Sequence, residues 1–166
     1  YRQEAPTPHQ KHSPARVAFA GYWGPNKGIE TFIQAANSME SFFGQIEFII
    51  AGSTGNQKDP YRKVISRLAR QSTASIMLPG TTESLEKLFS EIDVLVLPYW
   101  PELPSGTSAM AMHAAEFGVP LVASDTPALK NQIGQKNAHF VAPKDPYSLA
   151  QGIKAYLDNP KHFEDR

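Results

Sequence analysis

The chain has 166 residues, the length of one globular domain with a core of its own. Hydrophobic residues make up 41% and charged residues 19%, which excludes a disordered acidic tail. Sixteen basic and sixteen acidic residues leave no net charge, which argues against a module that binds nucleic acid duplexes. The absence of cysteine excludes disulfide scaffolds and zinc–thiolate sites, and no apolar run approaches the roughly twenty residues that cross a bilayer.

The first fifteen residues contain three prolines and few apolar side chains. We interpret residues 1–15 as an extended linker or tail. Because the chain starts at Tyr1 and no signal peptide precedes it, we expect a piece or a processed form of a longer protein. Residues 16–166 are then the folded domain.

After this tail, short apolar runs alternate with longer amphipathic segments, which is typical of repeated strand–helix units. Most runs are apolar at consecutive positions, as in parallel strands buried on both faces. The predicted strands are residues 16–20, 46–51, 75–78, 94–97 and 120–123, with a weaker sixth at 139–142. This pattern predicts a three-layer α/β fold, with a doubly wound, mostly parallel sheet of about six strands between two helix layers.

The segments between the predicted strands carry the signals of helix ends. Asp59 and Asp145 each precede a proline, so a capping residue is followed by the residue favoured at the first helical position. The polar residue Asp125 either orients a ligand or caps the next short helix, and capping is the reading we favour. Further helices are predicted at residues 83–92, 109–117 and 146–157.

A doubly wound sheet binds ligands at the carboxyl ends of its strands, so the loops there are the candidate sites. The loop after the first strand, residues 21–28, is rich in glycine and has Lys27 just before a helix, a place suited to anions. It is neither a Walker sequence nor a dinucleotide fingerprint, because the residue after Lys27 and the glycine spacing do not match. Taken alone, Lys27 is also compatible with a solvated lysine.

The loop after the fourth predicted strand is the richest in chemical groups. Ser105, Gly106, Thr107 and Ser108 place a glycine and three hydroxyls at a helix N-terminus, where free backbone amides and the helix dipole favour phosphate. The alternative is that Ser105 or Thr107 only caps the helix. Glu102 lies just before them.

His113 stands further along the same helix among small and apolar residues, and such a lone histidine is usually a partly buried structural residue. No histidine shows the spacing of metal ligands, and we expect no metal site.

The order of these pieces resembles the C-terminal, donor-binding domain of the group 1, family 4 retaining glycosyltransferases, which have the GT-B fold. The likeness spans residues 16–160. The stretches that carry it are residues 21–29, 78–80, 88–98, 118–125 and 141–150. The resemblance implies a Rossmann-like domain that binds a nucleotide-sugar, with an N-terminal acceptor domain as its partner.

The resemblance also implies roles for individual residues. Lys27 matches a lysine that contacts the donor diphosphate, beside Gly21. The backbone turn of Gly106, Thr107 and Ser108 matches the one that holds the sugar and phosphates. Leu78, Pro79 and Gly80 match the segment that meets the nucleobase, and His113 falls where the family binds the ribose.

Three positions depart from the family pattern. Tyr22 stands where an arginine is usual, so one of two expected phosphate-binding cations is missing. Ser105 and His113 stand at the places of the two family glutamates, and Glu102 is the carboxylate that could replace the first of them. We therefore take Lys27, Glu102 and Ser105 as the candidate catalytic residues.

From this resemblance we expect the donor half of a retaining glycosyltransferase, inactive in transfer by itself, with no cofactor or metal and no nucleic acid partner. The family context implies a cytoplasmic protein whose full-length form can contact the inner face of a membrane. An alternative is a non-catalytic nucleotide-sugar-binding or structural relative that has lost the acidic pair. A flavodoxin-like domain fits less well, because residues 21–27 hold neither an acidic cluster nor a flavin-phosphate loop.

Overall fold

The computed structural model describes residues 12–81, 83–103 and 108–159. Six parallel strands form one sheet in the order β3-β2-β1-β4-β5-β6. The strands are β1 (Ala15–Phe19), β2 (Ile46–Ala51), β3 (Ile76–Gly80), β4 (Val94–Leu97), β5 (Leu121–Ser124) and β6 (His139–Val141). The predicted fold class is confirmed, and all six predicted strands are present.

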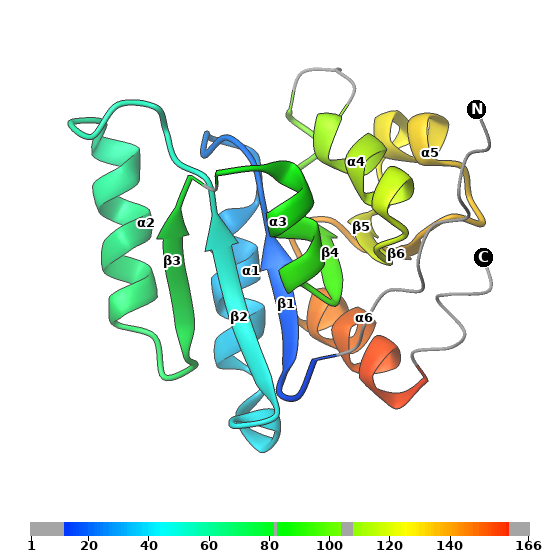
Figure 1. Ribbon diagram of the computed structural model, residues 1–166, viewed down its shortest axis with the longest axis horizontal. Coiled ribbons are helices and arrows are strands. Elements are labelled where there is room, and N and C mark those ends of the chain that lie inside the picture. Colours follow the sequence, from blue (N-terminus) through cyan, green and yellow to red (C-terminus); the bar gives the residue numbers. More distant parts are fainter. Residues whose placement is uncertain (1–11, 82, 104–107, 160–166) are drawn as a thin grey trace.

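The helices lie on both faces of this sheet. They are α1 (Ile29–Asn37), α2 (Pro60–Arg70), α3 (Leu85–Glu91), α4 (Ala109–Phe117), α5 (Pro127–Ile133) and α6 (Pro146–Asp158), with a 3-10 turn, η1 (Glu40–Phe42). Helices α1, α2 and α6 cover one face, and α3, α4 and α5 cover the other (Figure 1). Buried aromatic and aliphatic side chains fill both interfaces, and the largest that are fully buried include Phe19, Phe32, Phe48, Phe89 and Leu95.

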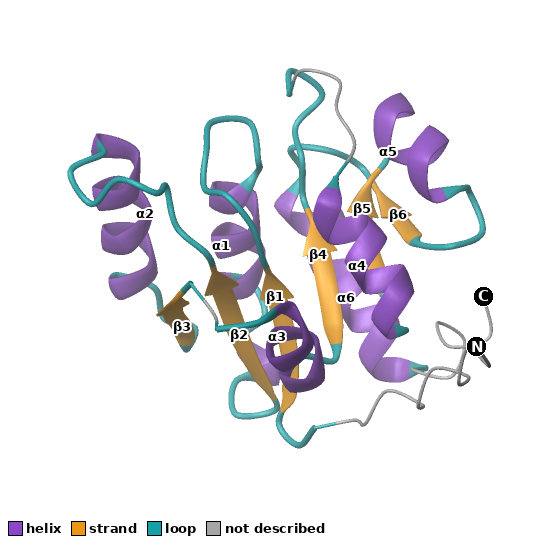
Figure 2. Cartoon of the chain, turned by 45° about the horizontal axis from the view of Figure 1, so that its top comes forward, coloured by secondary structure: helices purple, strands orange, loops and turns teal. Residues whose placement is uncertain are grey.

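The direction of the chain reverses across the sheet between β1 and β4. From β1 the chain winds outward to β3, then crosses to β4 and winds outward in the opposite direction to β6. The loops that follow β1, β2 and β4 all lie at one edge of the sheet, the one formed by the carboxyl ends of the strands (Figure 2). This edge, at the reversal point, is where doubly wound sheets bind ligands.

Helix caps follow the predictions in two cases. Asp59 accepts a hydrogen bond from the amide of Tyr61, and Asp145 accepts one from the amide of Ser148. The predicted helix at residues 83–92 is shorter in the structure, because the side chain of Ser84 caps it and the helix begins at Leu85.

One further capping prediction, that of Asp125, was wrong, and the alternative of a cap at Ser105 or Thr107 does not hold either. Thr126, not Asp125, caps α5: its hydroxyl accepts from the amide of Leu129, while Asp125 forms an ion pair of 2.9 Å with Lys130. Helix α4 is capped by Ser108, whose hydroxyl accepts from the amide of Ala111. In each case the capping residue directly precedes the first helical residue, which brings its hydroxyl closest to the unpaired amides.

We expect Thr126→Ala to lower the free energy of unfolding by about 1 kcal/mol, because one buried amide loses its partner. Asp125→Ala removes only a half-exposed ion pair and should cost between about 0 and 1 kcal/mol. Urea unfolding of both variants measures the difference. A larger loss for Asp125→Ala would mean that the ion pair, and not the cap, holds α5 in place.

Candidate functional site

The loops after β1 and β4 are in direct backbone contact at the reversal point of the sheet. Gly28 has a φ of 76°, and a Cβ added there would lie 1.7 Å from the carbonyl oxygen of Pro98. The amide of Trp100 donates to the carbonyl of Asn26 at 2.9 Å, and its indole Nε1 donates to Thr31 Oγ1 at 3.0 Å. The two loops therefore form one rigid unit.

Lys27 lies on this unit, over the ring of Tyr99. Its Nζ is 4.6 Å from the ring centroid, which is within the range of an attractive cation–π interaction. Burial lowers the pKa of Lys27 from the ordinary lysine value. Within the described ranges no carboxylate pairs with this ammonium group. Lys27 is thus a half-buried cation available to an anion.

The start of α4 lies next to the same tyrosine. The hydroxyl groups of Tyr99 and Ser108 are 3.1 Å apart and share a hydrogen bond. Burial raises the pKa of Tyr99, so its hydroxyl keeps its proton at neutral pH. Tyr99 therefore contacts Lys27 through its ring and the N-terminus of α4 through its hydroxyl. Ser105, Gly106 and Thr107, which were assigned to the same turn, lie outside the described residues.

Not every amide at the start of α4 is open to a ligand. The amide of Ser108 donates to Gln132 Oε1 at 2.7 Å, and Gln132 Nε2 donates back to the Ser108 carbonyl at 2.8 Å. The amides of Ala109 and Met110 have no partner in the part of the chain that the structure describes. The Ser108 amide, which was predicted to bind phosphate, is therefore already occupied by Gln132.

A depression of about 300 Å³ opens beside this helix start, at the carboxyl ends of β1, β2 and β3. Gly21 and Gly52 form part of its floor, and both need to be glycine: a Cβ on Gly52 would lie 1.9 Å from the Gly21 carbonyl oxygen. Gly21 in turn faces Met110 of α4, whose Cγ would lie 3.4 Å from an added Cβ. The remaining lining residues are Tyr22, Ala51, Ser53, Gly55, Thr81, Leu85 and Leu88. This lining holds glycines, hydroxyls and apolar side chains but no carboxylate.

The residues predicted to meet a nucleobase, Leu78, Pro79 and Gly80, are the last three residues of β3. Only Gly80, with a φ of 77°, turns the chain, and its carbonyl accepts from the Gly52 amide at the edge of the depression. Pro79 lines a different hollow, together with Met77, on the α3 face of the sheet. The predicted strand ended at residue 78, whereas the structure extends it to Gly80, because an edge strand tolerates the proline.

His113 and Glu102 are both held by neighbouring side chains. His113 packs against Phe89 of α3 and lies 3.4 Å from Glu116, and Met110 takes the place on α4 that faces the depression. Glu102 is exposed and forms an ion pair with Lys144, whose hydrogen bond lowers the pKa of the Glu102 carboxyl. The structure thus places Glu102 beside Trp100, since Lys144 Nζ lies 4.9 Å from the Trp100 ring.

Sequence reasoning missed four residues of this region: Tyr99, Trp100, Gln132 and Lys144. For the first two a signal was available, because two aromatic residues follow a buried strand at its carboxyl end, where side chains face the ligand edge. For Gln132 and Lys144 there was none, since their contacts join elements far apart in the sequence.

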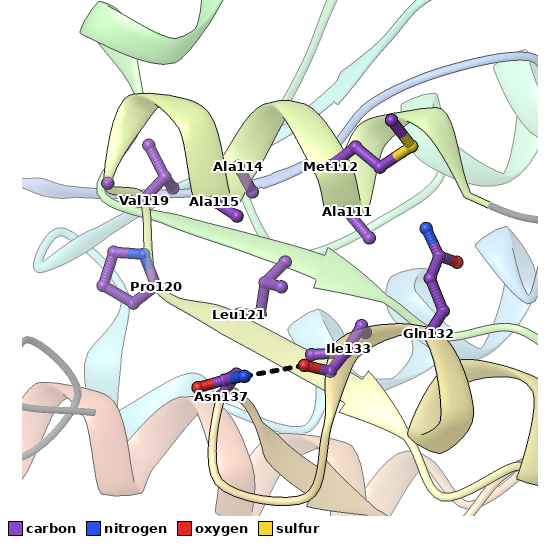
Figure 3. Close-up of a pocket in the computed structure, with 11 residues that line it drawn as sticks. Ala111, Met112, Ala114, Ala115, Val119, Pro120, Leu121, Gln132, Ile133 and Asn137 are labelled. Carbon is purple, nitrogen blue, oxygen red and sulfur yellow. Dashed lines mark hydrogen bonds between the residues drawn. The ribbon is translucent and has the colours of Figure 1, made fainter. Parts of the chain in front are cut away.

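A second depression, of about 460 Å³, lies between α4 and α5 (Figure 3), and Lys27 is not one of its lining residues. Ala111, Ala114 and Leu121 point into it, and Gln132 and Ile133 border it from α5. None of its lining residues is charged, so it offers nothing to neutralise an anion.

The described ranges, residues 12–81, 83–103 and 108–159, show neither a metal-binding cluster nor a membrane-spanning helix. They hold no group of three metal-binding side chains, and no helix there is both long enough and apolar enough to cross a membrane.

Six parallel strands whose order reverses between β1 and β4, with helices on both faces, define a Rossmann-like domain. Residues 14–159 match the family described as glycosyl transferases group 1, and the chain belongs to that family. No curated protein matches the sequence.

Solved glycosyltransferases with the GT-B fold share this architecture. Sucrose-phosphate synthase from Thermosynechococcus elongatus is 22% identical, with a TM-score of 0.76 over 90% of this chain and 38% of that one. HepE from Anabaena, in complex with UDP-glucose, is 16% identical, with a TM-score of 0.77 over 90% of this chain and 40% of that one. The chain thus spans about two fifths of these proteins.

The catalytic domain of cholesterol-α-glucosyltransferase from Helicobacter pylori is also similar. It is 19% identical, with a TM-score of 0.69 over 92% of both chains. At these identities the likeness shows the fold.

Proposed function

We propose that this chain is the donor-binding half of a retaining glycosyltransferase, which moves a sugar from a nucleotide-sugar to an acceptor. The observation that carries the proposal is the position of Lys27, 4.6 Å from the Tyr99 ring whose hydroxyl contacts the start of α4. Family membership and the UDP-glucose held by Anabaena HepE support a nucleotide-sugar as the ligand. The depression lined by Gly21, Gly52 and Met110 has room for the nucleoside.

Catalysis on this domain would consist of stabilising the leaving group. Breaking the bond between the sugar and the diphosphate increases the negative charge on the diphosphate. Lys27 and the N-terminus of α4 supply positive charge where it develops, which favours the transition state over the ground state. No metal is needed for this role. In the retaining class that the sequence resembles, the leaving phosphate itself takes the acceptor proton.

Glu102 and Ser105 complete the proposed catalytic set, and His113 is proposed near the ribose. For Glu102 to reach the donor sugar, its ion pair with Lys144 must open.

The acceptor site of this class lies on an N-terminal domain. We therefore expect this chain alone to bind nucleotide but not to transfer sugar. Cytoplasmic location, and contact of the full-length protein with a membrane, come from the family resemblance and belong to the same proposal.

A binding protein without catalysis is the second candidate. The replacement of the family arginine by Tyr22, and of the two glutamates by Ser105 and His113, favours it. Transfer by the full-length protein, or its absence when the nucleotide-sugar is bound, separates the two candidates.

The test is a calorimetric titration of the chain with UDP, GDP and ADP and with their glucose forms, with and without EDTA. We expect one base to bind most tightly and EDTA to have no effect. Lys27→Ala should weaken binding of that diphosphate roughly 10- to 100-fold, the value of one charge-assisted hydrogen bond. Affinity should also begin to fall at a pH below the ordinary lysine range, because burial lowers the pKa of Lys27.

Lys63→Ala, at an exposed position of α2, is the matched control and should leave affinity unchanged. If Lys27→Ala bound the diphosphate as tightly as the parent chain, the phosphate role of Lys27 would be refuted.

A further inference from the structure

The ammonium group of Lys27 is held in place before any ligand arrives. An unrestrained lysine loses rotamer freedom when it binds an anion, and this loss opposes binding. Here the side chain lies against the face of Tyr99, with Nζ 4.6 Å from the ring centroid. The negative face of the ring attracts the ammonium group and limits where it can point.

Tyr99 itself is fixed at both ends. The side chain is 6% exposed, and its hydroxyl shares a hydrogen bond with Ser108 Oγ, the residue that caps α4. The ring that contacts Lys27 is therefore hydrogen-bonded to the residue at the start of α4. Because Ser108 is also bonded twice to Gln132, this attachment point cannot shift easily.

The backbone beneath Lys27 is fixed as well. The carbonyl of the preceding residue, Asn26, accepts from the Trp100 amide, and Gly28 touches the Pro98 carbonyl. On its outer side, Trp100 is covered by Lys144, which pairs with Glu102. Three consecutive residues of the loop after β4 thus contact the lysine loop. Pro98 and Trp100 contact its backbone, and Tyr99 contacts the Lys27 side chain.

We propose that Tyr99 is a positioning residue for Lys27: it aims the ammonium group so that the lysine and the N-terminus of α4 bind the same diphosphate. The inference rests on the proposed function, because it assumes that this diphosphate belongs to a nucleotide. Tyr99 acts through Lys27: it reduces the conformational entropy that the Lys27 side chain loses when the diphosphate binds.

The test is a double-mutant cycle read by UDP binding to the whole chain. Tyr99→Leu removes the ring and should weaken UDP binding about tenfold, the effect of one partly desolvated cation–π contact. In the Lys27→Ala background the same change should matter less than about twofold, because no ammonium group is left to position. Tyr99→Phe keeps the ring and should restore most of the affinity lost in Tyr99→Leu.

Two controls separate positioning from damage to the fold. Uridine has no phosphate, so Tyr99→Leu should leave its binding unchanged, whereas a distorted domain would lose UDP and uridine together. Tyr147→Leu, on the exposed face of α6, should change neither.

The contact can also be measured without a ligand. In the NMR spectrum the Lys27 Hε signals should be shifted upfield by the ring in the parent chain and in Tyr99→Phe. An unshifted signal, or an equal loss of UDP affinity with and without Lys27, would overturn the positioning role even if UDP binds well. If neither UDP nor uridine bound the parent chain, the proposed function would fail first.

Discussion

Replacing Asp93 by alanine should cost about 3–5 kcal/mol of the free energy of unfolding, the largest single effect that we expect in this domain. The carboxylate is fully buried and accepts from the amide of His12 at 2.8 Å and from the amide of Arg16 at 2.7 Å. The His12 Nδ1 atom lies 3.0 Å from the same carboxylate. Its removal leaves these partly buried donors without their acceptor at the place where β1 joins β4. Urea unfolding monitored by circular dichroism measures the loss.

Asp125→Ala is the matched control, because it removes an aspartate whose ion pair with Lys130 is half-exposed. It should cost about 1 kcal/mol or less. Should the two variants unfold at similar urea concentrations, the bonds of Asp93 would not be what joins the start of β1 to the sheet.

Gly28→Ala should destabilise the domain by about 3 kcal/mol and weaken UDP binding at least tenfold. Its left-handed backbone costs a non-glycine residue roughly 1–2 kcal/mol, and overpacking against the Pro98 carbonyl adds about 1–3 kcal/mol. The carbonyl is backbone and cannot rotate away, so the two loops must separate. This separation moves Lys27 away from Tyr99. Unfolding and UDP titration of the same variant report both effects.

Gly44→Ala separates the two contributions, because Gly44 has a φ of 86° but nothing within 4 Å of an added Cβ. It should show only the backbone cost, about 1–2 kcal/mol, and normal UDP affinity. A Gly28→Ala variant that matched Gly44→Ala in stability and bound UDP normally would show that the contact with Pro98 does not hold the loop.

The fold could be predicted from the sequence because its signals are local. Consecutive apolar residues such as Val94–Leu97 indicate a strand buried on both faces, and the pairs at Asp59 and Asp145 mark helix starts. The errors fell where neighbouring residues compete for one role. Asp125 and Thr126 can both cap α5, and the choice depends on Lys130, one turn later, which pairs with the aspartate.

The candidate site could be predicted only in part. Lys27 was found because a lysine just before a helix is itself a local signal. Its partner Tyr99 is seventy-two residues away and becomes a neighbour only because β1 and β4 are adjacent in the sheet. Likewise, Gln132 reaches Ser108 from another helix, and Lys144 reaches Glu102 from the loop after β6. No residue pattern along the chain indicates such pairs.

The strand nearest the beginning of the chain is also one of the two in the middle of the sheet. Within this domain β1 is synthesised before the other strands, but its partner β4 is synthesised only after β2 and β3, so the central ladder closes late. Contacts between such distant segments make folding slow. Before β4 is synthesised, β1 can pair with β2 on one side only. This topology therefore requires that the unpaired side of β1 be protected during synthesis until β4 is available.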